Sequence, residues 1–331
     1  MTAAGRIEAA FRGSGLVLGV DAGGTSTRAV LLRDGIPERR LSSGPFNYLL
    51  DRHGTKRMAS LIREAGAAAA GIGIPGLARE AGADLALARA ISAASGAHVV
   101  VASDATVAWL GAFLGGPGIV VIAGTGSVAV GGPQTATARA GGHGFLIGDE
   151  GGGYWIGRQA LRAALAGTEG TGPPTRLAEA IPAATGCALD ELVVRVHREP
   201  RDRAILASLA PVVARCASGE GRSSGADRHG GAALTGSRDA GDPVAREILR
   251  AAAAELAELA SAVQRRLGTP AGSPQALGAG PPGAEAGRLP VAGVGGVFAI
   301  PELWAEFTRL TGARPPLAEP AIGAALLLGR G

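Results

Sequence analysis

The sequence contains one short pattern twice: an apolar strand, a turn that combines glycine with threonine, and a second strand. In the first copy the predicted strands are Leu16–Asp21 and Thr27–Leu32, and in the second they are Ile119–Ile122 and Val128–Val130. Each copy has the form of a hairpin, and the repetition indicates a weak internal duplication. We therefore expect an α/β fold made of two units that open in the same way.

The length of the chain agrees with two units, because 331 residues exceed the roughly 100–200 residues of a usual single domain. The predicted boundary lies at Gly115–Gly118, so the two domains are expected at residues 16–116 and 117–331. Residues 217–240 and 269–288 are of low complexity and rich in glycine. Such segments bury too little apolar area to offset the entropy of ordering, so we expect mobile surface insertions there.

Apolar runs predict two further strands, Ala67–Ile74 and His98–Ala102, and the second of them leads into Ser103-Asp104. Helices are predicted at Asp84–Ala94, Thr106–Leu114, Tyr154–Leu165, Leu206–Cys216, Val244–Leu267, Pro301–Thr311 and Ala321–Leu328. This order of strands and helices is typical of α/β domains.

Composition argues against several classes of protein. The formal charge is +4 and no basic run is interleaved with aromatic residues, so nucleic acid is not an expected partner. Cys187 and Cys216 are the only cysteines, which disfavours a disulfide scaffold or a structural zinc site. No stretch of about 18 apolar residues exists, so no membrane span is expected. Residues 1–15 lack the apolar core of a secretory signal, and we expect a flexible extension there and a cytoplasmic protein.

The two glycine turns are candidate phosphate sites. The first contains Gly23, Gly24 and Thr25, and the second is Gly124-Thr125-Gly126-Ser127. Glycine lets the backbone approach an anion, and amide and hydroxyl donors then cradle phosphate. Asp21, at the end of the first strand, is a candidate to hold Mg²⁺ through water, because hard cations prefer oxygen ligands. Neither turn is a P-loop, since the G-x-x-x-x-G-K-[ST] pattern is missing, and plain hairpin turns are the alternative.

Three further motifs carry chemistry. Asp104 stands between a strand and a helix, where it is either an N-cap or a base that accepts a proton from an attacking hydroxyl. Asp149 and Glu150 lie between glycines, an arrangement that suits sugar hydroxyls or simply a solvated helix start. Gly295 and Gly296 would let an adenine ring lie against the backbone, with a strand-to-helix turn as the alternative.

Taken together and in this order, the motifs resemble the N-acetylglucosamine kinase branch of the BadF/BadG/BcrA/BcrD ATPase family, within the actin/hexokinase/heat-shock-70 superfamily. The resemblance runs from about Leu16 to Leu328, without the two low-complexity segments. It implies two ribonuclease-H-like, actin-like ATPase domains that flank an ATP-binding cleft. By the resemblance, Asp104 is the catalytic aspartate, and Glu319-Pro320-Ala321 begins the closing helix motif. The implied ATP contacts are Gly23, Gly24, Thr25, Gly124, Thr125, Gly126, Ser127, Gly295 and Gly296.

The resemblance also implies where the sugar binds. The implied contacts are Asn47, Asp104, Thr125, His143, Gly144 and Asp149. The sequence departs from the family pattern at two places: His143 replaces a Trp in the usual Gly-Gly-Trp-Gly, and Gly152 stands where Ser is common. Both departures concern the pocket for the 2-substituent, and His143 is alternatively an ordinary histidine at the rim.

The implied activity is an ATP- and Mg²⁺-dependent transfer of phosphate to the 6-hydroxyl of N-acetylglucosamine, with a small sugar as partner and a homodimer as a possible assembly. Glucosamine is the first alternative, because a neutral His143 could accept a hydrogen bond from its ammonium. N-acetylmuramate, N-acetylmannosamine and glucose stay open. Two other classes are an ATPase activator of an acyl-CoA dehydratase and a non-catalytic sensor. The activators carry a cysteine before their Gly-Thr-Gly turn, for an iron–sulfur cluster, and Val121-Ile122-Ala123 has none.

Overall fold

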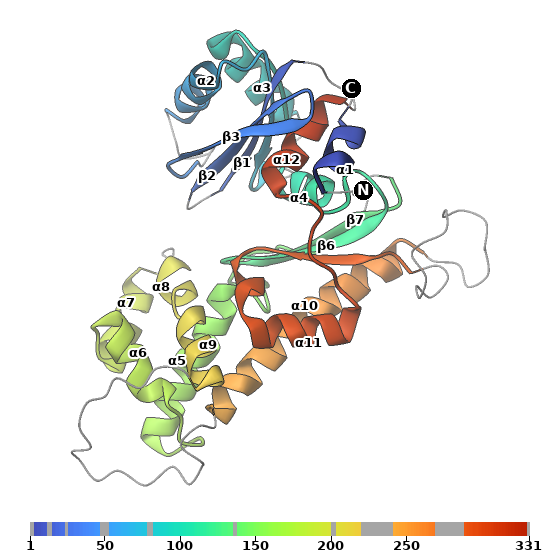
Figure 1. Cartoon of the computed structure of the whole chain (residues 1–331). Helices are drawn as coiled ribbons and strands as arrows, with labels where there is room; N and C mark the ends of the chain where they lie inside the picture. Colours follow the sequence, from blue (N-terminus) through green and yellow to red (C-terminus); the bar gives the residue numbers. More distant parts are fainter. Residues whose placement is uncertain are drawn as a thin grey trace.

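The protein has two α/β lobes, each built around one β-sheet (Figure 1). The structure is a computed structural model, and it describes residues 3–11, 15–23, 26–46, 53–77, 82–134, 138–199, 203–219, 241–268 and 288–329. All strands of the first sheet come from residues 16–103, and all strands of the second come from residues 118–294. The prediction of two α/β units is therefore confirmed.

The first sheet has the strand order β3-β2-β1-β4-β5. Its strands are β1 (Leu16–Ala22), β2 (Thr27–Arg33), β3 (Ile36–Ser43), β4 (Ala69–Ile74) and β5 (His98–Ser103). The first three are antiparallel neighbours, while β4 and β5 run parallel to β1. Because parallel strands end at the same edge of a sheet, Asp21 near the end of β1 and Asp104 after β5 share that edge.

Different helices cover the two faces of this sheet. Helices α2 (Gly54–Ala65) and α3 (Ala83–Ser95) pack on one face, where Met58, Ile62 and Ile91 are buried. On the other face lie α1 (Ala3–Ala10) and α12 (Pro320–Ala325), which is followed by the 3₁₀ helix η3 (Leu326–Gly329). Helix α12 contacts the sheet through backbone, because a Cβ on Gly19 would collide with the Ala321 carbonyl.

The second sheet has the strand order β8-β7-β6-β9. Its strands are β6 (Gly118–Ala123), β7 (Ser127–Gly132), β8 (Ala138–Gly141) and β9 (Val291–Val294), with β9 parallel to β6. The second lobe also contains η2 (Gly296–Ala299) and helices α5 (Gly153–Glu169), α6 (Leu177–Thr185), α7 (Leu189–Arg198), α8 (Arg203–Ala207), α9 (Ala210–Ser218), α10 (Pro243–Arg266) and α11 (Pro301–Thr311). Together they bury one aliphatic core that includes Ile156, Leu256 and Phe307.

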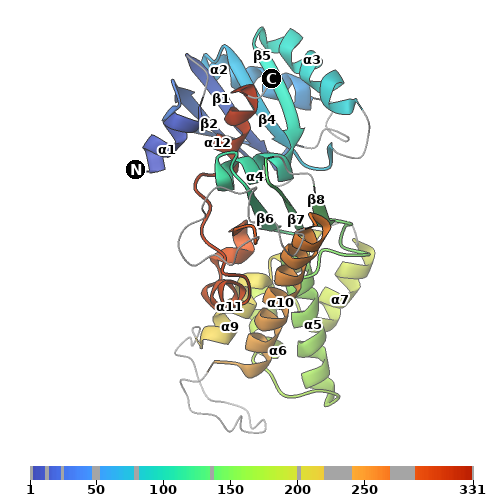
Figure 2. The same ribbon diagram turned by 90° about the vertical axis from the view of Figure 1, so that its right-hand side faces the viewer.

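Helix α4 (Asp104–Phe113) joins the lobes and lies between the two sheets (Figure 2). Towards the second sheet, Trp109 is buried with Val120 and Val130, and its indole N–H donates to the Gly118 carbonyl over 2.9 Å. Towards the first lobe, Val107 packs against Gly73 so closely that a Cβ there would collide with it. The helix that begins at Asp104 is thus held from both sides, which fixes the position of that carboxylate.

Most elements predicted from periodicity are present, and Pro301–Thr311 has the predicted bounds. The single helix predicted at Leu206–Cys216 is wrong, since α8 and α9 are separate helices. Pro211 explains the break, because proline lacks an N–H and its ring clashes with the carbonyl four residues earlier. Strands β3 and β8 and helices α2, α6 and α7 have no counterpart in the predicted elements.

The two ends of the chain differ from the predicted domain limits. A flexible extension at residues 1–15 is wrong for Ala3–Ala10, which form α1 with Ile7 buried against Val17 and Leu32. Residues 320–329, assigned by sequence to the second domain, pack on the first sheet. The boundary near Gly116 separates the strands of the two sheets, and the domain limits otherwise stay a prediction.

Of the two predicted low-complexity insertions, residues 220–240 and 269–287 lie outside the described residues. Ala217 and Ser218, which the prediction placed in the first of them, complete α9, and Ala217 is buried. Within the described part of the chain, none of the helices combines the length and the apolar character needed to cross a membrane.

Candidate active site

Two half-buried carboxylates, those of Asp21 and Asp104, lie at the same edge of the first sheet. Ser103 is the N-cap of α4, because its hydroxyl accepts the Thr106 N–H over 3.1 Å. The alternative role of Asp104 as that N-cap is therefore filled by its neighbour. The Asp104 carboxylate accepts the N–H of Ala105 over 2.8 Å through Oδ1. Its remaining capacity as an acceptor is available to a ligand.

Both carboxyls at this edge of the sheet have a raised pKa. Burial, with the charge of Asp104 next and that of Glu319 as a smaller cause, raises the pKa of Asp21 to about 6 against the opposing effect of Arg28. Burial also raises the pKa of Asp104, while the Ala105 N–H and the charge of Arg139 oppose the rise. A carboxyl with a raised pKa is a better general base near neutral pH than an ordinary one.

The second glycine turn lies at the start of α5. Its Gly124 and Thr125 carbonyls accept the N–H groups of Gly153 and Tyr154 over 2.8 and 3.0 Å. The Thr125 and Gly126 amides donate no hydrogen bond to any described residue. Two unpaired amides beside the positive end of a helix form a suitable site for an anion.

Ser127 and Asp149 hold different positions behind this turn. The Ser127 hydroxyl donates to the Glu150 carbonyl over 2.6 Å, so this group ties the turn to the next loop, and a contact to ATP stays a prediction. Asp149 is only 5% exposed, has a φ of 65°, and its carboxylate accepts no hydrogen bond from a described residue. A Cβ on Gly126 would collide with that carboxylate. Among the described residues the Asp149 oxygens are not fully buried atoms without a partner, as Thr308 Oγ1 is, so they are reachable by water or by the donors of a ligand.

The predicted adenine site adjoins the same turn. Strand β9 runs parallel to β6, and Gly295 lies so close to the Ala123 carbonyl that a Cβ would collide with it. Its φ of 115° also requires glycine. Around Gly296, in contrast, no described atom lies within 4 Å of where a Cβ would be. This glycine therefore leaves an open backbone surface beside the phosphate turn.

The loop from Gly141 to Gly148 carries His143 on an exposed position. Gly144 has a φ of 90°, which makes it a turn position, and its carbonyl accepts the Gly148 N–H over 2.8 Å. Gly152, which stands where Ser is common in the family, is packed against the Gly126 backbone, and a Cβ there would lie 2.8 Å from the Gly126 carbonyl carbon. The glycine at this departure therefore has a steric reason.

Three predicted contacts, Gly24, Thr25 and Asn47, lie outside the described residues. Gly23 is described, and its N–H donates to the Ser26 carbonyl over 3.0 Å within the first turn. Sequence reasoning did not single out Arg139, although this residue stands two positions before the Gly141-Gly142 pair.

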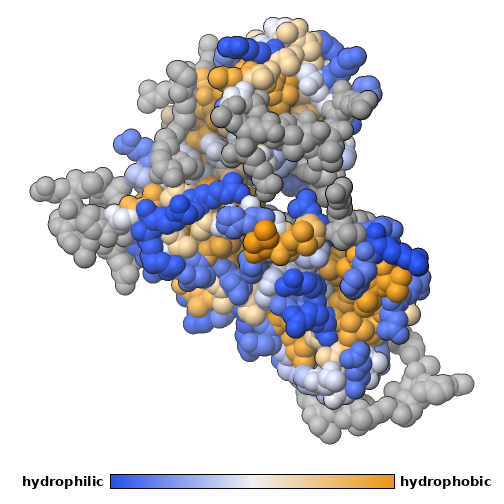
Figure 3. All heavy atoms as spheres, turned by 180° about the vertical axis from the view of Figure 1, so that it is seen from behind, coloured by the Kyte–Doolittle hydropathy of each residue, from blue (hydrophilic) through white to orange (hydrophobic). Residues whose placement is uncertain are grey.

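The space-filling view shows the surface hollowed where the two lobes meet (Figure 3). Among the described residues, no three His, Cys, Asp or Glu side chains form a cluster able to hold a metal ion.

Cys187 and Cys216 are both buried in the core of the second lobe.

Comparison with known proteins supports the same architecture. The candidate N-acetylglucosamine kinase of Chromobacterium violaceum superposes with a TM-score of 0.67 at 26% identity, covering 95% of this chain and 99% of that one. A ROK-family glucokinase of Streptomyces griseus, solved with glucose and AMPPNP, superposes with a TM-score of 0.53 at 19% identity, covering 96% and 100%. The second likeness concerns the fold alone. The two lobes have the actin-like ATPase fold of these proteins.

Sequence comparison identifies a relative over a shorter stretch. The N-acetylmuramic acid/N-acetylglucosamine kinase of Clostridium acetobutylicum is 39% identical over 102 residues, which are 30% of this chain and 31% of that protein. The match thus spans about a third of the relative. The model of the BadF/BadG/BcrA/BcrD ATPase family matches residues 18–226, which include both glycine turns, Asp104 and Asp149. With well over half of its length matched, the chain belongs to the BadF/BadG/BcrA/BcrD ATPase family.

Proposed function

We propose that this protein is an ATP-dependent sugar kinase that transfers the γ-phosphoryl group of ATP to the 6-hydroxyl of N-acetylglucosamine. The observation that carries the proposal is Asp149, a residue only 5% exposed whose carboxylate accepts no hydrogen bond from a described residue and still reaches solvent. Sugar hydroxyls are donors of the kind that it lacks. The Asp149 carboxylate lies next to Gly126, whose unpaired amide is a donor suited to phosphate. Acceptors for a sugar and donors for a phosphate thus stand side by side.

Asp104 is the proposed base. It accepts the proton of the 6-hydroxyl as the hydroxyl oxygen attacks the γ-phosphorus, and the bond from phosphorus to the bridging oxygen of ADP breaks. Its raised pKa suits this role, and α4 holds it from both lobes. Positioning supplies most of the catalysis, because little covalent chemistry is left to the protein.

The proposed nucleotide contacts divide between the lobes. Gly23, Gly24 and Thr25 contact the phosphates from the first lobe, and the turn Gly124–Ser127 contacts them from the second. The unpaired Thr125 and Gly126 amides support the second assignment. Gly295 and Gly296 would hold the adenine, and the open space beside Gly296 supports this.

A magnesium ion fits the residues present. Mg²⁺ commonly binds through one or two carboxylates together with substrate phosphates and waters, so the lack of a three-residue protein cluster is no obstacle. Asp21, whose pKa burial and Asp104 raise to about 6, would regain its charge beside a cation. When bound, Mg²⁺ neutralises charge on the β- and γ-phosphates.

The identity of the sugar is the finest part of the proposal. Asn47, Thr125, Gly144 and Asp149 are the proposed partners of the pyranose ring and its hydroxyls, with His143 near the 2-position. N-acetylglucosamine is named in the relatives from Chromobacterium violaceum and Clostridium acetobutylicum, which are 26% and 39% identical, and N-acetylmuramic acid is named in the second of them. Glucosamine is the alternative for which His143 is an argument. A cytoplasmic location and a homodimer are part of the same proposal.

The test is a coupled assay of ADP release across N-acetylglucosamine, glucosamine, N-acetylmuramate, N-acetylmannosamine and glucose, with phosphate position determined by NMR. We expect the highest kcat/KM with N-acetylglucosamine. Asp104→Asn should lower kcat by about a hundredfold to ten-thousandfold while ATP still binds. Asp190→Asn, an exposed acid in α7, is the matched control and should retain full activity. If Asp104→Asn retained most of its kcat, the proposed base would be wrong.

A further inference from the structure

Arg139 forms a fork onto the loop that carries His143. It lies on the edge strand β8, opposite Val130 of β7, and its side chain is exposed. Its Nε donates to the Gly141 carbonyl over 3.4 Å, and its Nη2 donates to the Gly142 carbonyl over 3.1 Å. A Cβ on Gly142 would collide with the same Nη2, so the guanidinium lies directly on the turn. The start of the loop is therefore closed over one arginine.

The backbone that carries this arginine is itself anchored. Arg266, in the last turn of α10, donates from Nη1 to the Arg139 carbonyl over 3.0 Å. Helix α10 contributes Leu256 and Val263 to the core of the second lobe. Arg139 therefore links helix α10, through Arg266, to the start of the exposed loop, through Gly141 and Gly142.

The rest of the loop has few contacts that would hold it. Leu146 and Ile147 are each 81% exposed, so they bury almost no apolar area. Phe145 makes a ring contact with Tyr154 at 4.9 Å between centroids, in the middle of the loop. Since a single exposed hydrogen bond contributes little to folding, we expect Arg139 to contribute little to global stability. We expect it to contribute mainly to the conformation of the loop at Gly141 and Gly142.

The charge of Arg139 also reaches the other lobe. Burial raises the pKa of Asp104, and the charge of Arg139 opposes that rise, as the Ala105 N–H does. One side chain thus contacts the loop of the proposed sugar site and acts on the proposed base.

We propose that Arg139 is a positioning residue, which fixes the loop Gly141–Gly148, and with it His143 and Asp149, relative to Asp104. The inference rests on the proposed kinase function for its substrate. Arginine suits the role because its planar fork serves two neighbouring carbonyls at once, which the single ammonium of lysine does with less precise geometry.

The kinetic test uses Arg139→Gln and Arg139→Lys in the full chain, with Arg162→Gln on the exposed face of α5 as the matched control. With N-acetylglucosamine, we expect the KM for the sugar to rise about tenfold in Arg139→Gln and to recover only in part in Arg139→Lys, while the KM for ATP changes less than about twofold. The melting temperature should fall by no more than about 2 °C. Equal rises in both KM values, or an unchanged sugar KM, would overturn the proposal.

A second measurement stays decisive if no tested sugar is a substrate. Amide hydrogen exchange is followed by mass spectrometry in the wild type and the two variants, without ligands. We expect faster exchange at residues 141–148 in Arg139→Gln, and unchanged exchange in α11, none of whose described residues forms a hydrogen bond with residues 141–148. Unchanged exchange at 141–148 would refute the role of Arg139, whereas an inactive wild type whose loop depends on Arg139 would refute only the kinase.

Discussion

The two glycine hairpins have the same local pattern but different surroundings. In the first, the half-buried Asp21 lies near the end of β1, and the Gly23 carbonyl accepts the N–H of Phe46 over 3.0 Å. In the second, no acid precedes the turn, and the turn carbonyls accept the first N–H groups of α5. A carboxylate favours a cation, whereas a helix N-terminus favours an anion. A duplicated hairpin has thus acquired complementary electrostatics in its two copies.

The strongest way to break this comparison is to fill the second turn. In Gly126→Ala the new Cβ would collide with the Asp149 carboxylate, so both the turn and the buried acid must shift. We expect kcat/KM to fall by about a hundredfold to a thousandfold, as when positioned donors are lost. Steady-state kinetics with varied sugar and ATP measure it.

Gly124→Ala is the matched control in the same turn. No atom lies within 4 Å of the Cβ that it would carry, and its φ lies outside the left-handed region. We expect a loss below about tenfold. Equal losses in the two variants would show that the collision with Asp149 is not the cause.

Asp21→Asn tests the electrostatics of the first hairpin. The substitution keeps the size of the side chain and removes its charge, so we expect kcat/KM for MgATP to fall about 10- to 100-fold. Titration with Mg²⁺ at fixed ATP should show a raised requirement for the metal. An unchanged Mg²⁺ dependence would remove Asp21 from the proposed metal site.

The same variant has an opposite effect on stability. Because the folded-state pKa of Asp21, about 6, lies above the ordinary value of 3.8, the folded protein holds this proton more tightly than the unfolded chain. The resulting stability is present below about pH 4 and is lost as the pH rises through about 6. Asp21→Asn should therefore be more stable than the wild type at pH 8, by up to about 3 kcal/mol, and equal to it at pH 4. Equal melting temperatures at pH 8 would contradict this.

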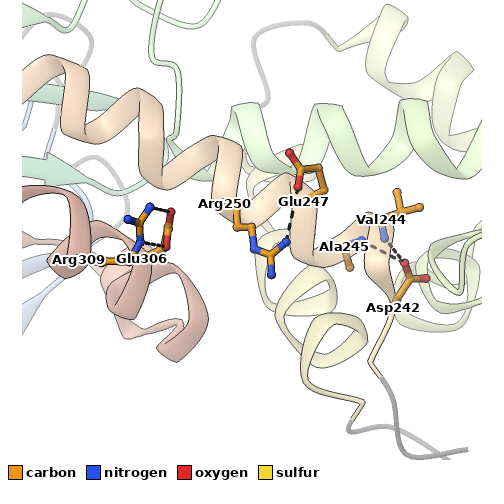
Figure 4. A network of polar contacts seen from close by, with 7 residues as sticks. All are labelled: Asp242, Val244, Ala245, Glu247, Arg250, Glu306 and Arg309. Carbon is orange, nitrogen blue, oxygen red and sulfur yellow. Dashed lines mark hydrogen bonds and ion pairs between the residues drawn. The ribbon is translucent and has the colours of Figure 1, made fainter. Parts of the chain in front are cut away.

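Asp242, which lies outside the proposed site, tests whether a loss of stability alone changes the activity. It is 3% exposed and caps α10, accepting the N–H groups of Val244 and Ala245 over 2.8 and 3.1 Å (Figure 4). It also accepts the Thr175 hydroxyl over 2.8 Å and the Arg176 N–H over 2.5 Å. Asp242→Ala leaves these buried donors unpaired, so we expect a loss of roughly 3 kcal/mol in unfolding free energy, measured by denaturant titration. At 25 °C, kcat/KM of the folded protein should stay within about twofold.

The smallest effect is expected from shortening the chain between α9 and α10. The ends of this segment are close, since the Asp242 N–H donates to the Cys216 carbonyl over 2.8 Å. Replacing residues 221–239 by a short Gly-Ser linker should change neither the melting temperature nor kcat/KM by much, because the entropy of loop closure depends only weakly on length. A large loss of activity would place the segment in the site or in an interface.

Several parts of the fold could not be predicted because their signals are not local. Strand β3 has mostly exposed side chains, so it lacks the alternation that identifies a half-buried strand. Strand β8 has four residues, which is too short for any periodicity. Helix α12 is predicted well as an element, yet its return to the first sheet depends on Gly19 and Gly71, which lie about 250 to 300 residues away in the chain.

The sequence by itself determined the two hairpins, the α/β class, the family, and the candidate residues Asp21, Asp104 and Asp149, because strand periodicity and glycine turns are local properties. Only the tertiary structure decided that α4 joins the lobes, that Asp149 is buried without a donor, and that Arg139 reaches both the loop and Asp104. The physical reason is that burial and charge depend on which distant segments pack together. A single sequence reports the residues that can pack, whereas their desolvation and their neighbours arise only when the chain has folded.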